Sequence, residues 1–426
     1  MRHITIQECY ESITISSEIN DKSINEKEAE ELESYIAIKD LERDNVVWGR
    51  NTITFINYVG YIRLSTVDIE ILPKISINNN DNELGRKALL NMLSKSGKIK
   101  VKFSDISSLN LYKMNLNEIL SYLFAYKLQR ELVKGPYKEY VYVEENSSVL
   151  KGSLLVKQQI INISSCVPKA YCRYEEFSMD NSLNQILNYC VKILLKEVGN
   201  RETIKLLRYA ESCFVDITQG EINDFEIASY KFNRLNSRFN EVFILAKMII
   251  KGYSALGNSG ASKAFSILFK MNEVFERYIT NLLNRSFEVG IIHPQHFKYK
   301  LLVNEDTDKG IFKLIPDIVI EQNGIEELII DIKWKNISSS YNRHGVKRED
   351  LYQMYAYLTR YPNVKKVILL YPENENVDYK GKSYLESWYL DNNESKKIRV
   401  YTVNLESEEN TINSLEKILS EIPDDV

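Results

Sequence analysis

Apolar and polar positions alternate in short runs along the first 75 residues of the chain. The clearest runs are residues 45–58 and 60–75, which are rich in β-branched and aromatic side chains and are interrupted by Gly and Pro. Such alternation is typical of strands joined by short turns. It predicts a small β meander, with an acidic surface helix over residues 25–35.

Helical spacing prevails in the next part of the chain, where apolar residues recur every three or four positions. One of these segments ends at Gly135-Pro136, a common helix stop, and residues 137–144 alternate again as a strand. Residues 252–262, rich in Gly and Ser, are the best candidate for a linker or hinge. The segments with helical spacing are 83–95, 116–134, 181–197, 201–216 and 237–252.

The pattern changes again after this candidate linker. Residues 262–287 place apolar side chains at three- and four-residue steps, which predicts one long amphipathic helix. Further strands and helices follow in an order that predicts a mixed sheet with helices packed on it. The strands are expected at 297–303, 311–321, 325–335, 364–371 and 397–404, and the helices at 347–360 and 411–420.

Together these patterns indicate an α+β (mixed α/β) protein with three regions. Residues 1–150 form a small β-rich region with helices, and residues 151–254 a helical middle. Residues 255–426 form a mixed sheet flanked by helices. A length of 426 residues suits two or three domains.

Charge and cysteine content exclude some classes of protein. The chain has 55 Lys and Arg against 59 Asp and Glu, a net charge of −4, so it does not coat nucleic acid through bulk positive charge. Its five cysteines are scattered without a C-x-x-C pair, which excludes a zinc knuckle and a disulfide framework. The start resembles no signal peptide and no apolar run approaches the ~18 residues of a membrane span, so we expect a cytoplasmic protein without membrane contact.

The candidate chemistry lies on two predicted strands that flank Asn323-Gly324, a strong hairpin signal. Asp331 and Lys333 are two residues apart on the second strand, so their side chains share one face. Asp317 lies on the first strand, and its face depends on the length of the turn.

A two-residue turn would place Asp317 opposite Ile330, facing away from Asp331. We predict instead a bulged three-residue loop formed by Gln322 and Asn323-Gly324. That loop pairs Asp317 with Ile329 and brings it to the face of Asp331.

Two close carboxylates repel each other unless a cation or a proton lies between them. Mg²⁺ prefers oxygen ligands, and a neighbouring lysine can hold or deprotonate the attacking water and offset negative charge in a phosphoryl transition state. Asp317, Asp331 and Lys333 therefore form a candidate centre for metal-dependent phosphodiester hydrolysis. A charged, solvated strand face is the alternative, because Pro-Asp and Asp-x-Lys are both common.

Two neighbouring helices add candidate residues. Gln353 and Tyr357 are four residues apart and share one face of the helix that follows the Asp331 strand. The helix before the first strand offers Glu273 and Glu276, either of which could supply a third oxygen ligand. Taken alone, Gln353 and Tyr357 also fit an ordinary polar–aromatic stripe, and each glutamate fits a solvent-facing helix carboxylate better than a ligand.

These residues resemble the PD-(D/E)xK nucleases of the RecB-like branch, including their Q-x-x-x-Y helix. Further segments resemble the McrC family, the nuclease subunits of McrBC modification-dependent restriction systems. These segments are GYIRL (60–64), IEILPKI (69–75), KGSLLV (151–156) and MNEVFERYI (271–279). The resemblance covers the chain from about residue 45 to the last strands, and Lys151 departs from it because the family favours arginine there.

The resemblance implies an endonuclease that depends on Mg²⁺ (or Mn²⁺), with residues 255–426 as its PD-(D/E)xK domain. It makes Glu276 the better choice for the helix carboxylate. It also implies that residues 1–150 bind a hexameric McrB-like AAA+ GTPase, stimulate its hydrolysis, and leave recognition of modified double-stranded DNA to that partner. Arg63 and Lys74 are candidates for contacting it, with plain surface charges as the alternative.

The charge and motif content agree with this division of labour, since the sequence contains no G-x-x-x-x-G-K-[ST] loop and nucleotide-driven movement must come from a partner. Two alternatives remain open at this point: an adaptor that activates a partner NTPase through a non-catalytic nuclease fold, and a stand-alone RecB-like nuclease. His293 and His296 are interpreted as a loop or strand pair. The loop around His344 either touches phosphates or is simply solvated.

Overall fold

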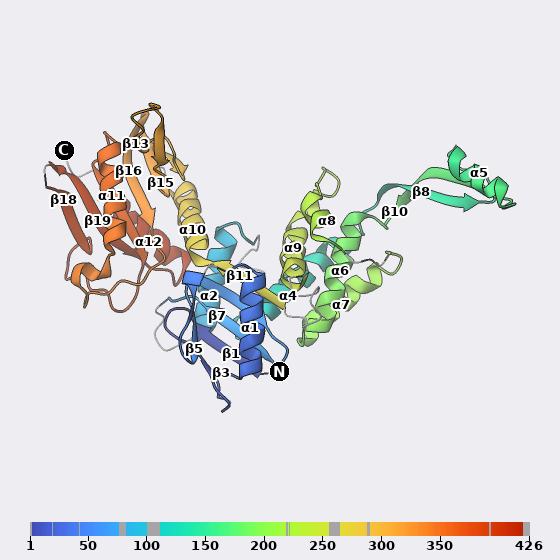
Figure 1. Cartoon of the computed structure of the whole chain (residues 1–426), viewed down its shortest axis with the longest axis horizontal. Coiled ribbons are helices and arrows are strands. Elements are labelled where there is room, and N and C mark those ends of the chain that lie inside the picture. The colour runs from blue at the N-terminus through green and yellow to red at the C-terminus, as the bar shows by residue number, and fades with distance from the viewer. Residues whose placement is uncertain are drawn as a thin grey trace. The chain divides into compact units, whose positions relative to one another are not determined.

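The chain folds into two compact units in the computed structural model (Figure 1). One unit comprises Met1–Leu116 and Ser262–Val426, and the other Asn117–Ala261. These units divide the chain at other points than the predicted boundaries at 150 and 254. The described residues are 2–18, 20–41, 43–75, 82–99, 111–218, 220, 222–254, 265–287, 290–391 and 393–420, so most of the predicted linker, from 255 to 262, lies outside them.

The N-terminal part of the first unit contains two four-stranded sheets, which confirms that this region is rich in strands. One sheet has the order β1-β7-β6-β11, formed by β1 (Arg2–Gln7), β7 (Val67–Leu72), β6 (Tyr58–Arg63) and β11 (Phe265–Lys270). The other has the order β3-β2-β5-β4, formed by β3 (Ser23–Ile24), β2 (Ile13–Ile15), β5 (Thr52–Phe55) and β4 (Val46–Trp48). The neighbouring helices are α1 (Glu26–Ile38) and α2 (Asn82–Lys95).

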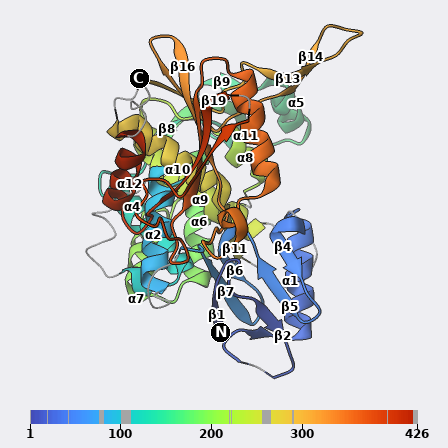
Figure 2. The same ribbon diagram turned by 90° about the vertical axis from the view of Figure 1, so that its left-hand side faces the viewer.

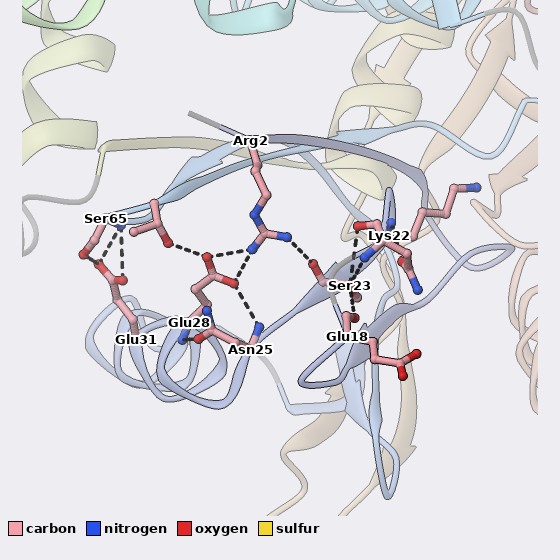
Figure 3. A network of polar contacts seen from close by, with 10 residues as sticks. Arg2, Glu18, Lys22, Ser23, Asn25, Glu28, Glu31 and Ser65 are labelled. Atoms are coloured by element: carbon pink, nitrogen blue, oxygen red, sulfur yellow. Dashed lines mark hydrogen bonds and ion pairs between the residues drawn. The ribbon is translucent and has the colours of Figure 1, made fainter.

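Helix α1 is fastened to the sheets by a network of polar contacts (Figure 3). Asn25 caps the helix by accepting a hydrogen bond from the backbone N–H of Glu28, whose carboxylate in turn accepts one from the N–H of Asn25. The guanidinium of Arg2 donates to both oxygens of Glu28, at 2.8 and 2.6 Å, and to the carbonyl oxygen of Ser23. The first strand is thus joined to α1 and β3.

The predicted helix over 262–287 is wrong in its first part. Phe265–Lys270 form β11, which pairs antiparallel with β6, and the helix α10 begins only at Met271 and ends at Ser286. Alternate residues of β11 are apolar, and Ile267 and Phe269 are buried. Close pairing needs Gly60, because a Cβ on this residue, at φ 142°, would lie 1.9 Å from the carbonyl oxygen of Ile267.

The C-terminal part of the first unit is a six-stranded mixed sheet, as predicted. The strand pairs β12–β15 and β15–β16 are antiparallel, and the pairs β16–β17 and β17–β19 are parallel. The edge strand β18 pairs antiparallel with β19. In spatial order the strands are β12 (Ile291–Pro294), β15 (Ile318–Gln322), β16 (Ile325–Ile332), β17 (Lys366–Pro372), β19 (Asn393–Val403) and β18 (Glu386–Leu390). The edge strands β12 and β18 were not predicted.

Helices cover both faces of this sheet (Figure 2). On one face α11 (Arg348–Arg360) packs Met354, Tyr357 and Leu358 into a core with Val319 and Ile329. On the other face lie α10 and α12 (Glu408–Ser420). The single strand predicted over 311–321 is two strands: β14 (Gly310–Lys313) pairs with β13 (Lys300–Val303) in a separate ribbon, and β15 starts after Pro316, which has no N–H for a ladder.

The second unit combines helices with a long two-stranded ribbon. Its helices are α4 (Leu116–Leu132), α6 (Ser182–Glu197), α7 (Arg201–Cys213), α8 (Asp224–Ser229) and α9 (Asn240–Ser254). The ribbon pairs β8 (Glu139–Ser147) with β10 (Ala170–Ser178), and it carries β9 (Ser153–Leu154) and α5 (Val156–Ser164). No helix in the described part of the chain combines the length and the apolar character that crossing a bilayer requires.

Candidate active site

The hairpin that carries the candidate site has a shorter turn than predicted. Gln322 pairs with Ile325, so that Asn323 and Gly324 alone form the turn, with φ angles of 50° and 80°. Positive φ at both central residues is what a two-residue hairpin turn of type I′ requires. The predicted three-residue loop is therefore wrong.

A bulge in β16 brings Asp317 and Asp331 to the same face of the sheet, as the three-residue loop was expected to do. Glu321 pairs with Glu326 and Ile320 with Leu328, which leaves Glu327 as the extra residue of β16. The register therefore shifts by one, and Ile318 pairs with Ile330. Asp317, the residue before β15, is then aligned with Asp331 rather than with the predicted Ile329, and aligned residues share a face of the sheet.

Asp331 is buried and Asp317 is half-buried, and their negative charges have little compensation. The side chain of Asp331 is 1% exposed, and neither of its oxygens accepts a well-aligned hydrogen bond from any described residue, although Nζ of Lys333 lies 2.6 Å from Oδ2. Asp317 accepts a hydrogen bond from the backbone N–H of Ile332 at 2.7 Å. Burial and the charge of Asp331 raise the pKa of Asp317 to about 8, and burial also raises the pKa of Asp331.

Lys333 is held in a chain of hydrogen bonds that leads to α11. Its Nζ donates to Oε1 of Gln353 at 2.9 Å, Nε2 of Gln353 donates to the hydroxyl of Tyr357 at 2.8 Å, and this hydroxyl donates to the carbonyl oxygen of Ile315 at 3.2 Å. Burial alone would lower the pKa of Lys333, but the charges of Asp331 and Asp317 outweigh it and raise the pKa. The amine is therefore an ammonium group at neutral pH.

Glu276 lies near the aspartates but not in one cluster with them. Its Oε1 accepts a hydrogen bond from Gln295 at 2.9 Å, and the backbone N–H of Gln295 donates to the carbonyl oxygen of Asp317. Burial raises the pKa of Glu276, and Asp331 adds to this rise. Among the described residues no three His, Cys, Asp or Glu side chains are grouped to hold a metal ion. The alternative ligand, Glu273, instead pairs with Lys98 at 2.9 Å.

The pair formed by Asp317 and Asp331 is a suitable site for a divalent cation. Neither oxygen of Asp331 accepts a well-aligned hydrogen bond, and burial together with the charge of Asp331 makes a negative charge on Asp317 unfavourable without a further cation. Mg²⁺ is commonly bound through one or two carboxylates, with water and phosphate oxygens completing its shell. Asp317 and Asp331 match this donor set, and Glu276 remains a predicted additional ligand.

A second ion pair beside the site was not predicted from the sequence. Nζ of Lys335 donates to both oxygens of buried Asp350, at 2.8 and 2.9 Å, and the charge of Asp350 contributes to the raised pKa of Asp331. Asp350, Gln353 and Tyr357 follow each other at three- and four-residue steps on α11. That spacing is the signal that could have revealed Asp350.

The remaining candidates have local partners. His293 lies in β12 with Nε2 3.0 Å from Oε2 of Glu321, and Nδ1 of His296 lies 3.0 Å from the hydroxyl of Tyr361. The loop after β16 contains a short 3-10 turn, Asn342–Gly345, in which Nδ1 of His344 lies 3.2 Å from the hydroxyl of Ser339.

Arg63 and Lys74, the two basic residues predicted to contact the partner, are not plain surface charges. Arg63 forms an ion pair with Asp68 at 2.8 Å, and the side chain of Lys74 is buried.

Two solved structures resemble this chain. The first is the half-complex of Thermococcus gammatolerans McrB AAA+ hexamers with bound McrC, with a TM-score of 0.74 and 22% sequence identity over 98% of this chain and 100% of that chain. The second is a cryo-EM structure of the Thermococcus gammatolerans McrBC complex, with a TM-score of 0.52 and 26% identity over 66% of this chain and 87% of that chain. The chain therefore has the mixed α/β fold of McrC.

The family follows from the sequence itself. Residues 53–372 match the family described as the McrBC 5-methylcytosine restriction system component. The chain belongs to this family, which confirms the resemblance found in its sequence. No curated protein matches the chain.

Proposed function

We propose that this chain is the DNA endonuclease subunit of a McrBC-like restriction complex and hydrolyses phosphodiester bonds with the help of Mg²⁺ or Mn²⁺. The observation that carries the proposal is the buried Asp331, whose oxygens lack well-aligned hydrogen bonds beside Asp317 and Lys333. Buried charges are ordinarily matched, and strongly perturbed carboxyl groups gather at functional sites. Membership of a restriction-system family supports the same reading.

Each residue of the site has a role that follows from its contacts. Asp317 and Asp331 would hold the divalent ion, with Glu276 assisting. The bound ion would supply an activated water and neutralise charge on the phosphate. Lys333, an ammonium group oriented by Gln353, stabilises negative charge that develops on the phosphoryl oxygens, and it can orient the attacking water. Tyr357 fixes Gln353 through its hydroxyl.

We further propose that a McrB-like AAA+ GTPase hexamer is the partner. The solved relatives consist of McrB AAA+ hexamers with bound McrC, and this sequence contains no phosphate-binding loop of its own. A net charge of −4 gives weak affinity for DNA alone, so the partner would recognise the modified double-stranded DNA and move along it. Residues 1–150 would contain the surface that binds the partner and stimulates its GTPase.

The test is Asp331→Ala in the complex reconstituted from the full chain and its AAA+ partner. Cleavage of plasmid DNA containing 5-methylcytosine should fall by at least roughly 10³-fold, because the ion loses a ligand, while stimulation of the GTPase persists. Asp391→Ala, which changes an exposed aspartate of the same sheet region, is the matched control. Undiminished cleavage by the Asp331 variant contradicts the proposal.

A further inference from the structure

One fully buried carboxylate of the first unit has no role in the proposed chemistry. Glu8 follows β1, and its side chain is surrounded by N–H donors. Its Oε1 accepts a hydrogen bond from the indole N–H of Trp334 at 2.7 Å and a long one, 3.5 Å, from the backbone N–H of Lys74. Its Oε2 accepts from the backbone N–H of Asn57 at 2.6 Å.

The hydrogen bond from Trp334 links Glu8 to the segment that carries Lys333. Trp334 is the residue after Lys333, and its carbonyl oxygen accepts a hydrogen bond from Nζ of Lys74 at 3.1 Å. Its ring meets Phe275 edge to face, with ring centroids 5.2 Å apart. Phe275 is next to Glu276 on α10, so the indole lies between the segment that carries Lys333 and the helix that carries Glu276.

The contact with Asn57 reaches the same helix at its start. The backbone carbonyl oxygen of Asn57 accepts a hydrogen bond from the N–H of Met271 at 2.9 Å, and its Oδ1 accepts from the N–H of Asn272 at 2.8 Å. Asn57 therefore caps α10, and it does so with a φ of 62°, a conformation that asparagine tolerates better than most residues. The hydrogen bond from its N–H to Glu8 holds it in this orientation.

We propose that Glu8 is a positioning residue of the nuclease: it fixes the segment after Lys333 and the start of α10 relative to each other, so that Lys333 and Glu276 stay aligned with the aspartate pair. This inference rests on the proposed function. It makes the N-terminal sheet a structural part of the catalytic centre, although the sequence indicates only a region that binds the partner. A loose supporting shell lowers catalysis even when every reacting group is present.

Two substitutions remove this support, the first of them with almost no change in volume. Glu8→Gln keeps one acceptor oxygen and turns an NH₂ group toward a donor, so it satisfies either Trp334 or Asn57 but not both. Trp334→Phe removes the indole N–H and keeps an aromatic ring beside Phe275. Glu30→Gln, an exposed carboxylate on α1, is the matched control.

The experiment measures cleavage of 5-methylcytosine plasmid DNA by the full chain reconstituted with its AAA+ partner, well below the thermal midpoint of each variant. We expect kcat to fall about tenfold for Glu8→Gln and for Trp334→Phe while KM for DNA changes less than twofold. The Mg²⁺ concentration for half-maximal cleavage should rise. The double variant should lose less than the sum of the two single losses, because both substitutions disrupt one connected set of hydrogen bonds around Glu8.

Asp331→Ala is assayed in parallel to separate two kinds of failure. If it is inactive while both positioning variants keep the kcat and the Mg²⁺ dependence of the control, this inference is overturned and the proposed function stands. Additive losses in the double variant overturn it as well, because they show that the two side chains act independently. Full cleavage by Asp331→Ala overturns the proposed function and this inference with it.

Discussion

Two buried carboxylates of the first unit, Glu70 in β7 and Asp331 in β16, differ in the hydrogen-bond donors and charges around them. Glu70 accepts hydrogen bonds from Nε and Nη2 of Arg86, at 2.9 and 2.6 Å, and from the backbone N–H of Leu116 at 2.8 Å. Although burial alone would raise the pKa of Glu70, these donors, with His3, lower it to about 2. The carboxylate is matched, and it joins the sheet to α2 and to the backbone of Leu116 within the same unit.

Asp331 has no such set of donors. Burial raises its pKa although Lys333 stands 2.6 Å from one oxygen, and its neighbour Asp317 has a pKa raised to about 8. A buried charge that is matched contributes to stability, and one left unmatched costs stability. The difference indicates that Glu70 serves the fold, and it supports the proposal that Asp317 and Asp331 bind an ion.

Replacing the ammonium group of the site should have the largest effect. We expect Lys333→Met to lower kcat for DNA cleavage by roughly 10³-fold, about 4 kcal/mol, because charge on the phosphoryl oxygens loses its stabilising partner. Stimulation of the GTPase should persist, and Lys309→Met, an exposed lysine, should cleave normally. Cleavage at the wild-type rate by Lys333→Met would favour the adaptor function instead.

Replacing the matched carboxylate should affect the fold and not the chemistry. Glu70→Gln leaves buried Arg86 without its counter-charge, so we expect the free energy of unfolding to fall by about 3–5 kcal/mol. Denaturant unfolding of the full chain measures this change. A loss below about 1 kcal/mol, similar to that of the exposed control Glu30→Gln, would mean that Glu70 is not the structural counterpart that we describe.

The pH dependence of stability follows from the lowered pKa of Glu70. Because its pKa is about 2 in the folded chain against 4.5 ordinarily, its contribution is complete above pH 4.5 and is lost as the pH falls toward 2. The shift corresponds to about 3 kcal/mol. Wild type and Glu70→Gln, unfolded by denaturant between pH 6 and 3, should therefore converge in stability as the pH falls. A constant difference contradicts the assignment.

Neutralising Asp331 should have the smallest effect on stability and the opposite sign. In the absence of divalent ions we expect Asp331→Asn to raise the free energy of unfolding by about 1–2 kcal/mol, since burial raises the pKa of Asp331 and an amide has no charge to desolvate. Thermal unfolding measures the gain, which should shrink when Mg²⁺ stabilises the wild type. A destabilised variant would show that the charge of Asp331 is structurally matched after all.

Local sequence patterns were sufficient for much of the C-terminal sheet and for the residues gathered at the site. They failed where long-range contacts decide the structure. The bulge at Glu327 accompanies the burial of Glu326, whose carboxylate pairs with Lys298 on a distant segment, and no local pattern marks it. Asn323-Gly324 correctly predicted a tight hairpin turn. The register between β15 and β16, however, depended on the bulge at Glu327.

The same limit explains the error at β11. The apolar residues of Phe265–Lys270 fit both a helix and a strand, and the edge of β6, about 200 residues earlier, decides for the strand. The support of the site by Glu8 could not be predicted either, because Glu8 and Trp334 are 326 residues apart in the sequence. Periodicity shows which face of an element is buried, but not which distant polar group it meets.

A calorimetric titration of the full chain with Mn²⁺ tests most directly whether Asp317 and Asp331 bind a divalent ion. We expect wild type and Glu30→Gln to bind the ion at a site that Asp317→Asn and Asp331→Asn each abolish, with both variants still folded. Equal binding by the wild type and the two aspartate variants would show that Asp317 and Asp331 do not hold the catalytic ion.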